Sequence, residues 1–190
     1  MSPKLTTILD EDVTDPKERH DLIVACSLSS AQLNEAEETV YGSGCGPVGG
    51  GELLARVLED PSHIDSEIME FTRGAFTEAT QRGISVQRYE MTCDEEIHAF
   101  GADKVLKHNT KYPEKKRSYI GFINGLCSDF REAEFPEGQR LFGVFATPLK
   151  DKTSHADIFV IIKPNKLQKA AIQQVFHDAF KLEKLIACPS

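Results

Sequence analysis

The C-terminal third of the chain contains three short segments rich in apolar and β-branched residues. They span residues 118–126, 141–147 and 156–162, and their composition and alternation are typical of β-strands. The connectors between them contain Pro, Gly, Asp and Ser, which favour turns. Because short connections favour antiparallel neighbours, the pattern predicts an antiparallel three-strand meander.

A helix is predicted after the last of these segments. Pro164 ends the strand, and Asn165 is a suitable N-cap residue. A three-strand sheet needs a covered face to be stable, so we expect this amphipathic helix to pack on the meander. Its apolar stripe recurs at spacings of three and four residues and consists of Ile172, Val175, Phe176, Ala179 and Leu182.

The first half of the chain has patterns that favour helices. The apolar run 22–26 is either a buried strand or the start of a helix, because periodicity does not separate the two at this length. Residues 27–38 are compatible with a helix. Two more helices are predicted, one beginning at Glu52 and one near Ser62.

A strand and a further helix complete the predicted elements. Residues 84–89 alternate as a strand does, and Thr92 opens a capping box with Glu95. The predicted fold class is therefore α+β, with a mostly helical N-terminal part. The antiparallel three-strand meander follows, covered by the C-terminal amphipathic helix.

Two segments differ in composition from the rest of the chain. Residues 1–21 combine two prolines with a group of four acidic residues and are predicted to form a mobile acidic arm. Residues 42–51 include six glycines and are predicted to form a flexible loop. Residues 22–190 then form a single α+β domain.

Charge is distributed unevenly around a net value of −8. Residues 1–110 hold 9 basic and 21 acidic side chains, whereas residues 111–190 hold 13 and 9. This polarity suits a charged partner, although the overall acidity argues against nonspecific binding to nucleic acid. No apolar run is long enough for a membrane span, and no secretory signal is evident, so we expect a soluble cytoplasmic protein without a membrane partner.

The five cysteines give no sign of a metal site or a disulfide framework. Their number is odd, and no Cys-x-x-Cys pair occurs. Most are expected to be small buried apolar residues. We therefore expect no metal and no cofactor from the sequence.

His155 and Asp157 are the strongest candidates for catalysis. They lie two residues apart at the start of a predicted strand, so alternation places them on one face. A carboxylate beside an imidazole suits a general base or a pair of metal ligands. The alternative is structural, with His155 bonding the loop and Asp157 holding a neighbouring turn.

Ligand-binding candidates lie elsewhere in the chain. His63 follows Pro61 in a tight turn, and Arg88 shares a face with Ile84 and Val86 in the strand predicted at 84–89. If the face of that strand that carries Arg88 is inside, its guanidinium must be paired; otherwise it is a surface residue. A basic set with two tyrosines nearby could contact phosphates and bases. It comprises Lys111, Lys115, Lys116 and Arg117.

Several segments together resemble a group of small, uncharacterised bacterial proteins. The first runs from Gly51–Leu58 through Asp60-Pro61-Ser62-His63 to Gly74-Ala75-Phe76 and Gly83–Arg88, and the second is Pro148–Ile158. In that group the late loop reads Pro-Leu-x-Asp-Asn-Pro-x-His-Ala, and here Lys152 and Thr153 replace Asn-Pro. The resemblance draws attention to His63, Arg88 and His155 and implies no reaction.

Three functions remain open from the sequence. The leading prediction is a non-enzymatic accessory or protein-interaction module of a bacterial cell, with another protein as its partner. The second is a small metal- or acid/base-dependent hydrolase or nuclease-like enzyme that uses His155 and Asp157. The third is a module that contacts nucleic acid through the basic C-terminal half.

Overall fold

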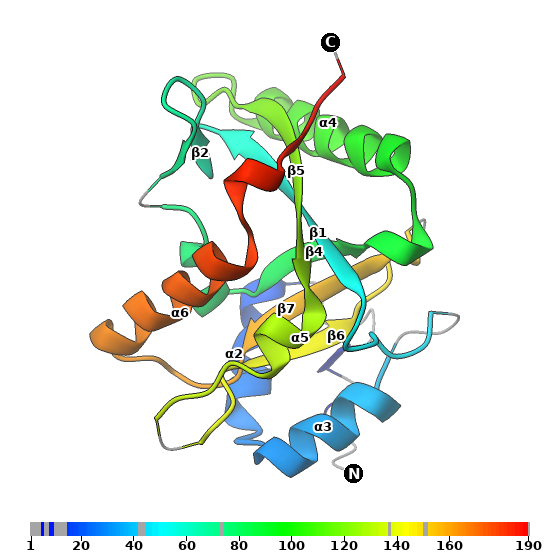
Figure 1. Cartoon of the computed structure of the whole chain (residues 1–190), viewed down its shortest axis with the longest axis vertical. Helices are drawn as coiled ribbons and strands as arrows, with labels where there is room; N and C mark the ends of the chain where they lie inside the picture. The colour runs from blue at the N-terminus through cyan, green and yellow to red at the C-terminus, as the bar shows by residue number, and fades with distance from the viewer. Residues whose placement is uncertain are drawn as a thin grey trace.

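The computed structural model describes Leu5, Ile8, Leu9 and residues 15–41, 45–72, 74–136, 138–149 and 152–189. A six-stranded antiparallel sheet forms its centre, with the strand order β6-β7-β4-β1-β5-β8 (Figure 1). The strands of this sheet are β1 (Leu53–Asp60), β4 (Ile84–Arg88), β5 (Ser118–Leu126), β6 (Phe142–Ala146), β7 (His155–Val160) and β8 (Ile186–Ala187). A separate hairpin joins β2 (Ile64–Asp65) to β3 (Glu70–Phe71).

Helices lie on both faces of the sheet. The α-helices are α2 (Pro16–Ala25), α3 (Ser30–Thr39), α4 (Asp94–Lys111), α5 (Cys127–Arg131) and α6 (Lys166–Ala179). Short 3-10 turns are η1 (Thr77–Thr80), η2 (Tyr89–Met91) and η3 (Leu182–Lys184).

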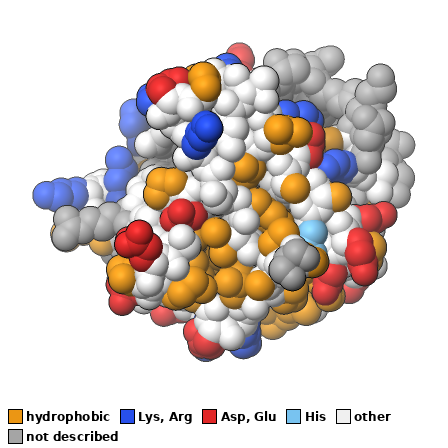
Figure 2. Space-filling model, turned by 90° about the horizontal axis from the view of Figure 1, so that it is seen from above, with side chains coloured by type: hydrophobic (Ala, Val, Ile, Leu, Met, Phe, Trp, Pro, Cys, Tyr) orange, Lys and Arg blue, Asp and Glu red, His pale blue; other side chains and the backbone are white. Residues whose placement is uncertain are grey.

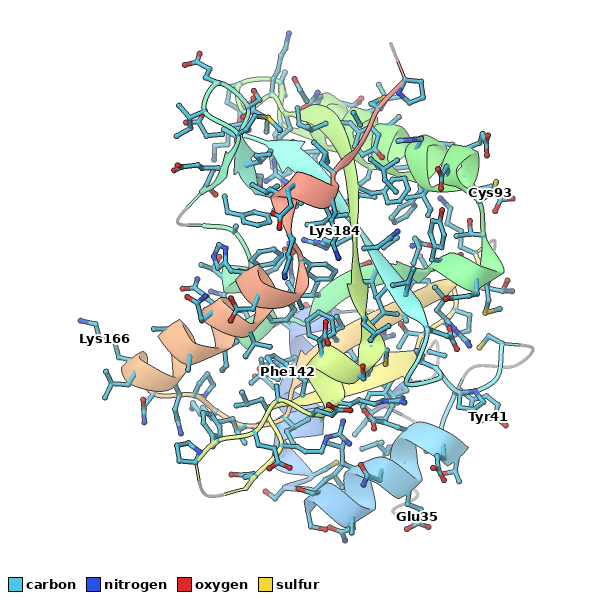
Figure 3. The ribbon with its side chains drawn as sticks, viewed as in Figure 1. Glu35, Tyr41, Cys93, Phe142, Lys166 and Lys184 are labelled. Carbon is cyan, nitrogen blue, oxygen red and sulfur yellow. The ribbon has the colours of Figure 1, made fainter. Side chains whose placement is uncertain are left out.

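Strand register shows which helices share a face. Ala55 lies opposite Gln87, Gln87 lies opposite His155, and directly paired residues point the same way. On this face α4 contacts β1 and β5, while α2 contacts β7 and α3 contacts β6. The other face carries α5, α6 and η1 over the largest apolar cluster. Figure 3 shows Phe142 in this interior beside α5, whereas Lys166 and Glu35 project outward.

The predicted three-strand meander is wrong. Only β6 and β7 among the three predicted strands are neighbours, because β4 and β1 lie between β7 and β5. The connection from β5 to β6 contains α5 and carries the chain across the sheet. Two strands from the N-terminal half, β1 and β4, therefore separate β5 from β7.

The C-terminal helix begins where it was predicted but does not cover a meander. The side chain of Asn165 accepts a hydrogen bond from the Gln168 N–H at 3.0 Å and so caps α6. Ile172 and Phe176 are fully buried. The helix packs with α5 and η1 over one face of the six-stranded sheet.

Two of the predicted helices are also wrong. The segment that begins at Glu52 is the central strand β1, whose residues 54–59 are all buried. A strand covered on both faces has a continuous apolar run, which matches helical spacing as well. The segment near Ser62 forms the β2–β3 hairpin and η1, with Ile64 buried and Ile68 63 % exposed.

The remaining element predictions are confirmed by the structure. Strands occupy the segments predicted at 84–89, 118–126, 141–147 and 156–162, each within one to two residues at its ends. The run 22–26, left open between strand and helix, belongs largely to α2. The capping box at Thr92 is not formed, yet α4 follows it directly.

Parts of the predicted arm and glycine loop lie outside the described residues. Residues 1–4, 6–7, 10–14 and 42–44 are among these. Of the arm, Leu5, Ile8 and Leu9 are buried in the cluster beneath α2 and α3, and residues 16–21 belong to α2. The mobility of residues 1–21 and 42–51 stays a prediction.

Candidate functional site

The candidate site lies where β1 and β4 separate. Their ladder pairs Leu54 with Arg88 and Ala55 with Gln87, and it stops there. Farther along β4, Arg56 donates from Nη1 to the backbone oxygen of Ser85 at 2.8 Å. The Arg56 side chain is 1 % exposed. Its guanidinium therefore donates to the Ser85 backbone oxygen beyond the end of the β1–β4 ladder.

Ser85 and His155 form a direct contact on the α2/α4 face of the sheet. Ser85 Oγ lies 2.5 Å from His155 Nε2, although 70 residues separate them in the chain. Their strands pair so that Ser85 is opposite Asp157 and Gln87 is opposite His155. His155 is buried, whereas Ser85 keeps partial exposure.

The backbone fixes which ring nitrogen of His155 carries a proton in the neutral ring. The backbone oxygen of Thr147 lies 2.8 Å from Nδ1 of His155. A carbonyl oxygen only accepts hydrogen bonds, so Nδ1 is the donor. Nε2 is then an acceptor, and Ser85 Oγ–H donates to it.

Asp157 reaches this pair through the hydroxyl of Thr147. Thr147 Oγ1 donates to Asp157 Oδ2 at 2.8 Å and lies 3.0 Å from His155 Nδ1. Arg19 of α2 contributes a positive charge 3.9 Å from the same carboxylate oxygen. The prediction that His155 and Asp157 share a face is confirmed by the register, and a relay from Asp157 through Thr147 and His155 to Ser85 results.

A buried ionic group lies on the other side of Arg56. Its Nη2 contacts Glu78 Oε1 and lies 3.2 Å from His63 Nε2. Arg82 adds a second contact to Glu78 at 2.5 Å. Burial would raise the pKa of Glu78, but Arg56, His63 and Arg82 together hold the pKa of that carboxyl well below its ordinary value.

His63 has the opposite kind of shift. Burial, assisted by the charge of Arg56, lowers the pKa of the imidazole to about 3. Its Nδ1 accepts a hydrogen bond from the Glu59 N–H at 3.3 Å. His63 is therefore neutral near pH 7 and Glu78 is ionised, so neither group is matched to proton transfer at neutral pH.

An open pocket of about 270 Å³ reaches this ionic group from the surface. Its lining is largely polar. The lining residues are Ser62, His63, Gly74, Thr77, Glu78, Gln81 and Arg82.

Arg117, one of the predicted ligand-binding residues, contacts Glu59, whose backbone N–H is bonded to His63. The carboxylate oxygens of Glu59 contact Lys104 Nζ and Arg117 Nη1, both at 2.7 Å. Burial would raise the pKa of Glu59, but these two cations lower it to about 2. Lys115 and Lys116 are exposed and make no contact with the site among the described residues.

The Arg88 side chain binds the glycine-rich loop. Its guanidinium forms a two-point contact with Glu52, at 2.7 Å for each pair of atoms. It also donates to the backbone oxygens of Cys45, Gly46 and Pro47. Both faces of β4 are covered, and Arg88 lies on the same face as Ile84 and Val86, which belong to the largest apolar cluster. The Arg88 side chain is paired as a buried guanidinium requires. Among the described loop residues, Gly49 N–H is bonded to the Glu52 carboxylate at 2.6 Å.

The segments that carry the resemblance meet at three contacts. Glu52 pairs with Arg88, Arg56 lies beside His63, and Ser85 contacts His155. Sequence reasoning missed Ser85, Thr147, Arg56 and Glu78. Arg56 had a usable signal, since a lone arginine interrupts the apolar run 53–58. Membership in the bacterial group stays a prediction.

Exposed apolar side chains gather at the end of the molecule that carries α4. Figure 2 shows hydrophobic surface over much of this end. Leu106 on α4 is 66 % exposed, and Ile68 and Met69 are exposed in the β2–β3 turn. The predicted protein partner is not tested by this surface and stays a prediction.

Comparison with known proteins finds no matching family model, no matching curated protein and no matching solved structure. Within the described ranges, no helix has both the length and the apolar character of a membrane span. In the same residues, no group of three or more His, Cys, Asp or Glu side chains is arranged to hold a metal ion.

Proposed function

We propose that this protein is a hydrolase in which Ser85 is the nucleophile and His155 its general base. The observation that carries the proposal is the 2.5 Å contact between Ser85 Oγ and His155 Nε2. The ring orientation is fixed by Thr147, so Nε2 is the acceptor that a serine hydroxyl needs for activation.

The reaction would proceed by acyl transfer. His155 Nε2 takes the Ser85 proton as Oγ attacks the carbonyl carbon of an ester or amide, and the same proton then passes to the departing alcohol or amine. Water next attacks the acyl-serine, giving a proton to His155, which returns it to Ser85 as the acid departs. Asp157, acting through Thr147, favours the imidazolium that forms between these steps.

A covalent probe tests the proposal directly. A fluorophosphonate should label the wild-type protein at Ser85, and peptide mass analysis locates the labelled residue. The hydrolysis of p-nitrophenyl acetate should also depend on Ser85 and His155. Ser85→Ala and His155→Gln should each lose labelling and lower hydrolysis by about 100-fold or more, the scale for general-base activation.

The matched control is Ser118→Ala, which alters an exposed serine at the start of β5. It should label and hydrolyse like the wild type. Circular dichroism checks that each variant is folded. If the folded wild-type protein takes up no probe at Ser85 and Ser85→Ala hydrolyses the ester at the wild-type rate, the hydrolase proposal is rejected.

A further inference from the structure

The open pocket beside Glu78 has several hydrogen-bond donors that the fold does not use. Ser62 and Gln81 line it, and neither side chain forms a hydrogen bond within the described ranges. Arg82 contacts Glu78 through Nη2 alone, and its side chain is 56 % exposed, so its other N–H groups remain available. The pocket therefore offers hydroxyl, amide and guanidinium donors to a molecule that enters from the surface.

His63 adds a buried donor that has no acceptor. Its Nδ1 accepts from the Glu59 N–H at 3.3 Å, so Nε2 carries the proton of the neutral ring. Nε2 lies 3.2 Å from Arg56 Nη2, which can only donate. Glu78 Oε1 is 3.9 Å from Nε2, beyond hydrogen-bond distance. Because His63 is 5 % exposed and lines the pocket, an acceptor bound there would complete its bonding.

The charged groups at the pocket favour an anion. Glu78 is the only carboxylate in the lining that the structure describes, and both of its oxygens contact arginines, Arg56 and Arg82. With His63 neutral, two cations stand against one carboxylate. Behind them the buried carboxylate of Glu59 is matched by two cationic side chains of its own. The local charge is thus positive, and the buried surroundings strengthen its effect on a bound ion.

We infer that this pocket binds a phosphate group. The phosphate oxygens accept from His63 Nε2, from the guanidinium of Arg82 and from the hydroxyl of Ser62, and the amide of Gln81 lies beside them. A tetrahedral anion with several acceptor oxygens matches several donors around a positive site. The volume of about 270 Å³ accommodates a phosphate, and the opening lets an ester substituent extend into solvent. This site goes beyond the proposed hydrolysis and does not depend on it.

Titration calorimetry with small anions tests the ligand class. Near neutral pH and at low salt, inorganic phosphate should bind the wild-type protein at one site with a dissociation constant in the millimolar range or below. Acetate should bind about tenfold more weakly, because it has only two acceptor oxygens. Methyl phosphate distinguishes the sources of the group. Binding as tight as that of phosphate indicates a phosphate ester, and binding about tenfold weaker indicates free phosphate.

Variants of exposed residues test the charge and the place of the site. Arg82→Gln should weaken phosphate binding by about tenfold or more, since it removes a charged donor. Gln81→Glu should weaken binding by a similar factor, whereas Gln81→Lys should not weaken it, because only the sign of the new charge differs. The matched control is Lys107→Gln on α4, where the lysine is 76 % exposed and also contacts a carboxylate. It should bind phosphate like the wild type.

Nitrogen-15 NMR of the histidine rings locates the bound anion. Phosphate should shift the Nε2–H signal of His63, which is identified by its loss in His63→Asn, and leave the ring signal of His20 in place. Ser85→Ala should show the same shift, because Ser85 does not line the pocket. An unmoved His63 signal, acetate binding as tight as that of phosphate, or unchanged binding in both Arg82→Gln and Gln81→Glu would overturn the inference whether or not Ser85 is labelled.

Discussion

Buried charged side chains in this protein are joined into small groups of both signs. Arg56 contacts Glu78, and Glu59 contacts Lys104. Arg140 contacts Glu37 through Nη1 and Nη2, each at 2.9 Å. Each group offsets part of the cost of removing charge from water. Such groups are consequently sensitive to the loss of one member and to pH.

His63 should make the protein less stable in mild acid. Its pKa is about 3 in the folded protein against 6.5 in the unfolded chain, so the unfolded chain binds the proton first as pH falls. The contribution of neutral His63 to the free energy of unfolding is therefore complete above pH 6.5 and is lost progressively as the pH falls toward 3. Between pH 6.5 and 4.5 this loss should reach about 2 kcal/mol.

The variant His63→Asn keeps an acceptor for the Glu59 N–H and removes the titration. Urea unfolding at pH 6.5 and 4.5 should show a smaller loss of stability in this variant than in the wild type. Part of the loss should remain, because burial also lowers the pKa of His20 and of His177. Glu59, whose pKa is about 2, contributes its own loss only below pH 4.5. His108→Asn is the control, and an equal pH effect in all three proteins would contradict the assignment.

At the scale of elements, side chains form hydrogen bonds with backbone groups at strand edges, at strand ends and in the glycine-rich loop. Glu37 of α3 accepts from the Val144 N–H of β6 at 2.8 Å and covers that edge of the sheet. Glu90 accepts from the Leu53 N–H at the start of β1. Arg88 fastens the described part of the glycine-rich loop to β4 through Cys45 and its neighbours.

Arg88→Lys should release this loop. Lysine keeps the charge but lacks the fork that contacts Glu52 and three backbone oxygens, so we expect a loss of stability of about 2 kcal/mol. Limited digestion with subtilisin should cut residues 45–51 faster than in the wild type. Arg82→Lys, at an arginine whose side chain is 56 % exposed, should be neutral in both measurements. Equal cutting of the loop in wild type and Arg88→Lys would show that Arg88 does not hold it.

At the scale of the whole molecule, aromatic packing joins the helical layer to the sheet. Phe176 of α6 lies among four other rings, with centroid distances of 5.1 Å to Phe142 and 5.3 Å to both Phe76 and Phe130. Phe180 completes the group at 6.2 Å. Phe130 lies in α5, Phe142 in β6, Phe76 just before η1 and Phe180 just after α6, so the Phe176 ring contacts elements distant in sequence.

Phe176→Ala should therefore cost about 3–5 kcal/mol of unfolding free energy, the range for emptying a large core site. Leu167→Ala on the same helix, where Leu167 is 83 % exposed, should change stability by less than about 0.5 kcal/mol. Chemical denaturation of both variants provides the comparison. A cost below about 1 kcal/mol for Phe176→Ala would place α6 away from this core.

The sequence by itself determined the elements whose signals are local. The cap at Asn165, the alternation of residues 84–88 and the apolar strand at 118–126 lie within short windows, so their secondary structure follows from nearby residues. Sequence also placed His155 and Asp157 on one face, because alternation in a strand is a local property.

The tertiary structure alone decided the sheet order and the composition of the site. A strand completes its hydrogen bonds with partners that are distant in the chain, so β1 became recognisable as a strand only between β4 and β5. The contact of Ser85 with His155 depends in the same way on the pairing of β4 with β7. The sequence contains Ser85 and His155, but the distance between their side chains is set by the register of β4 against β7. No short segment of this chain encodes that register.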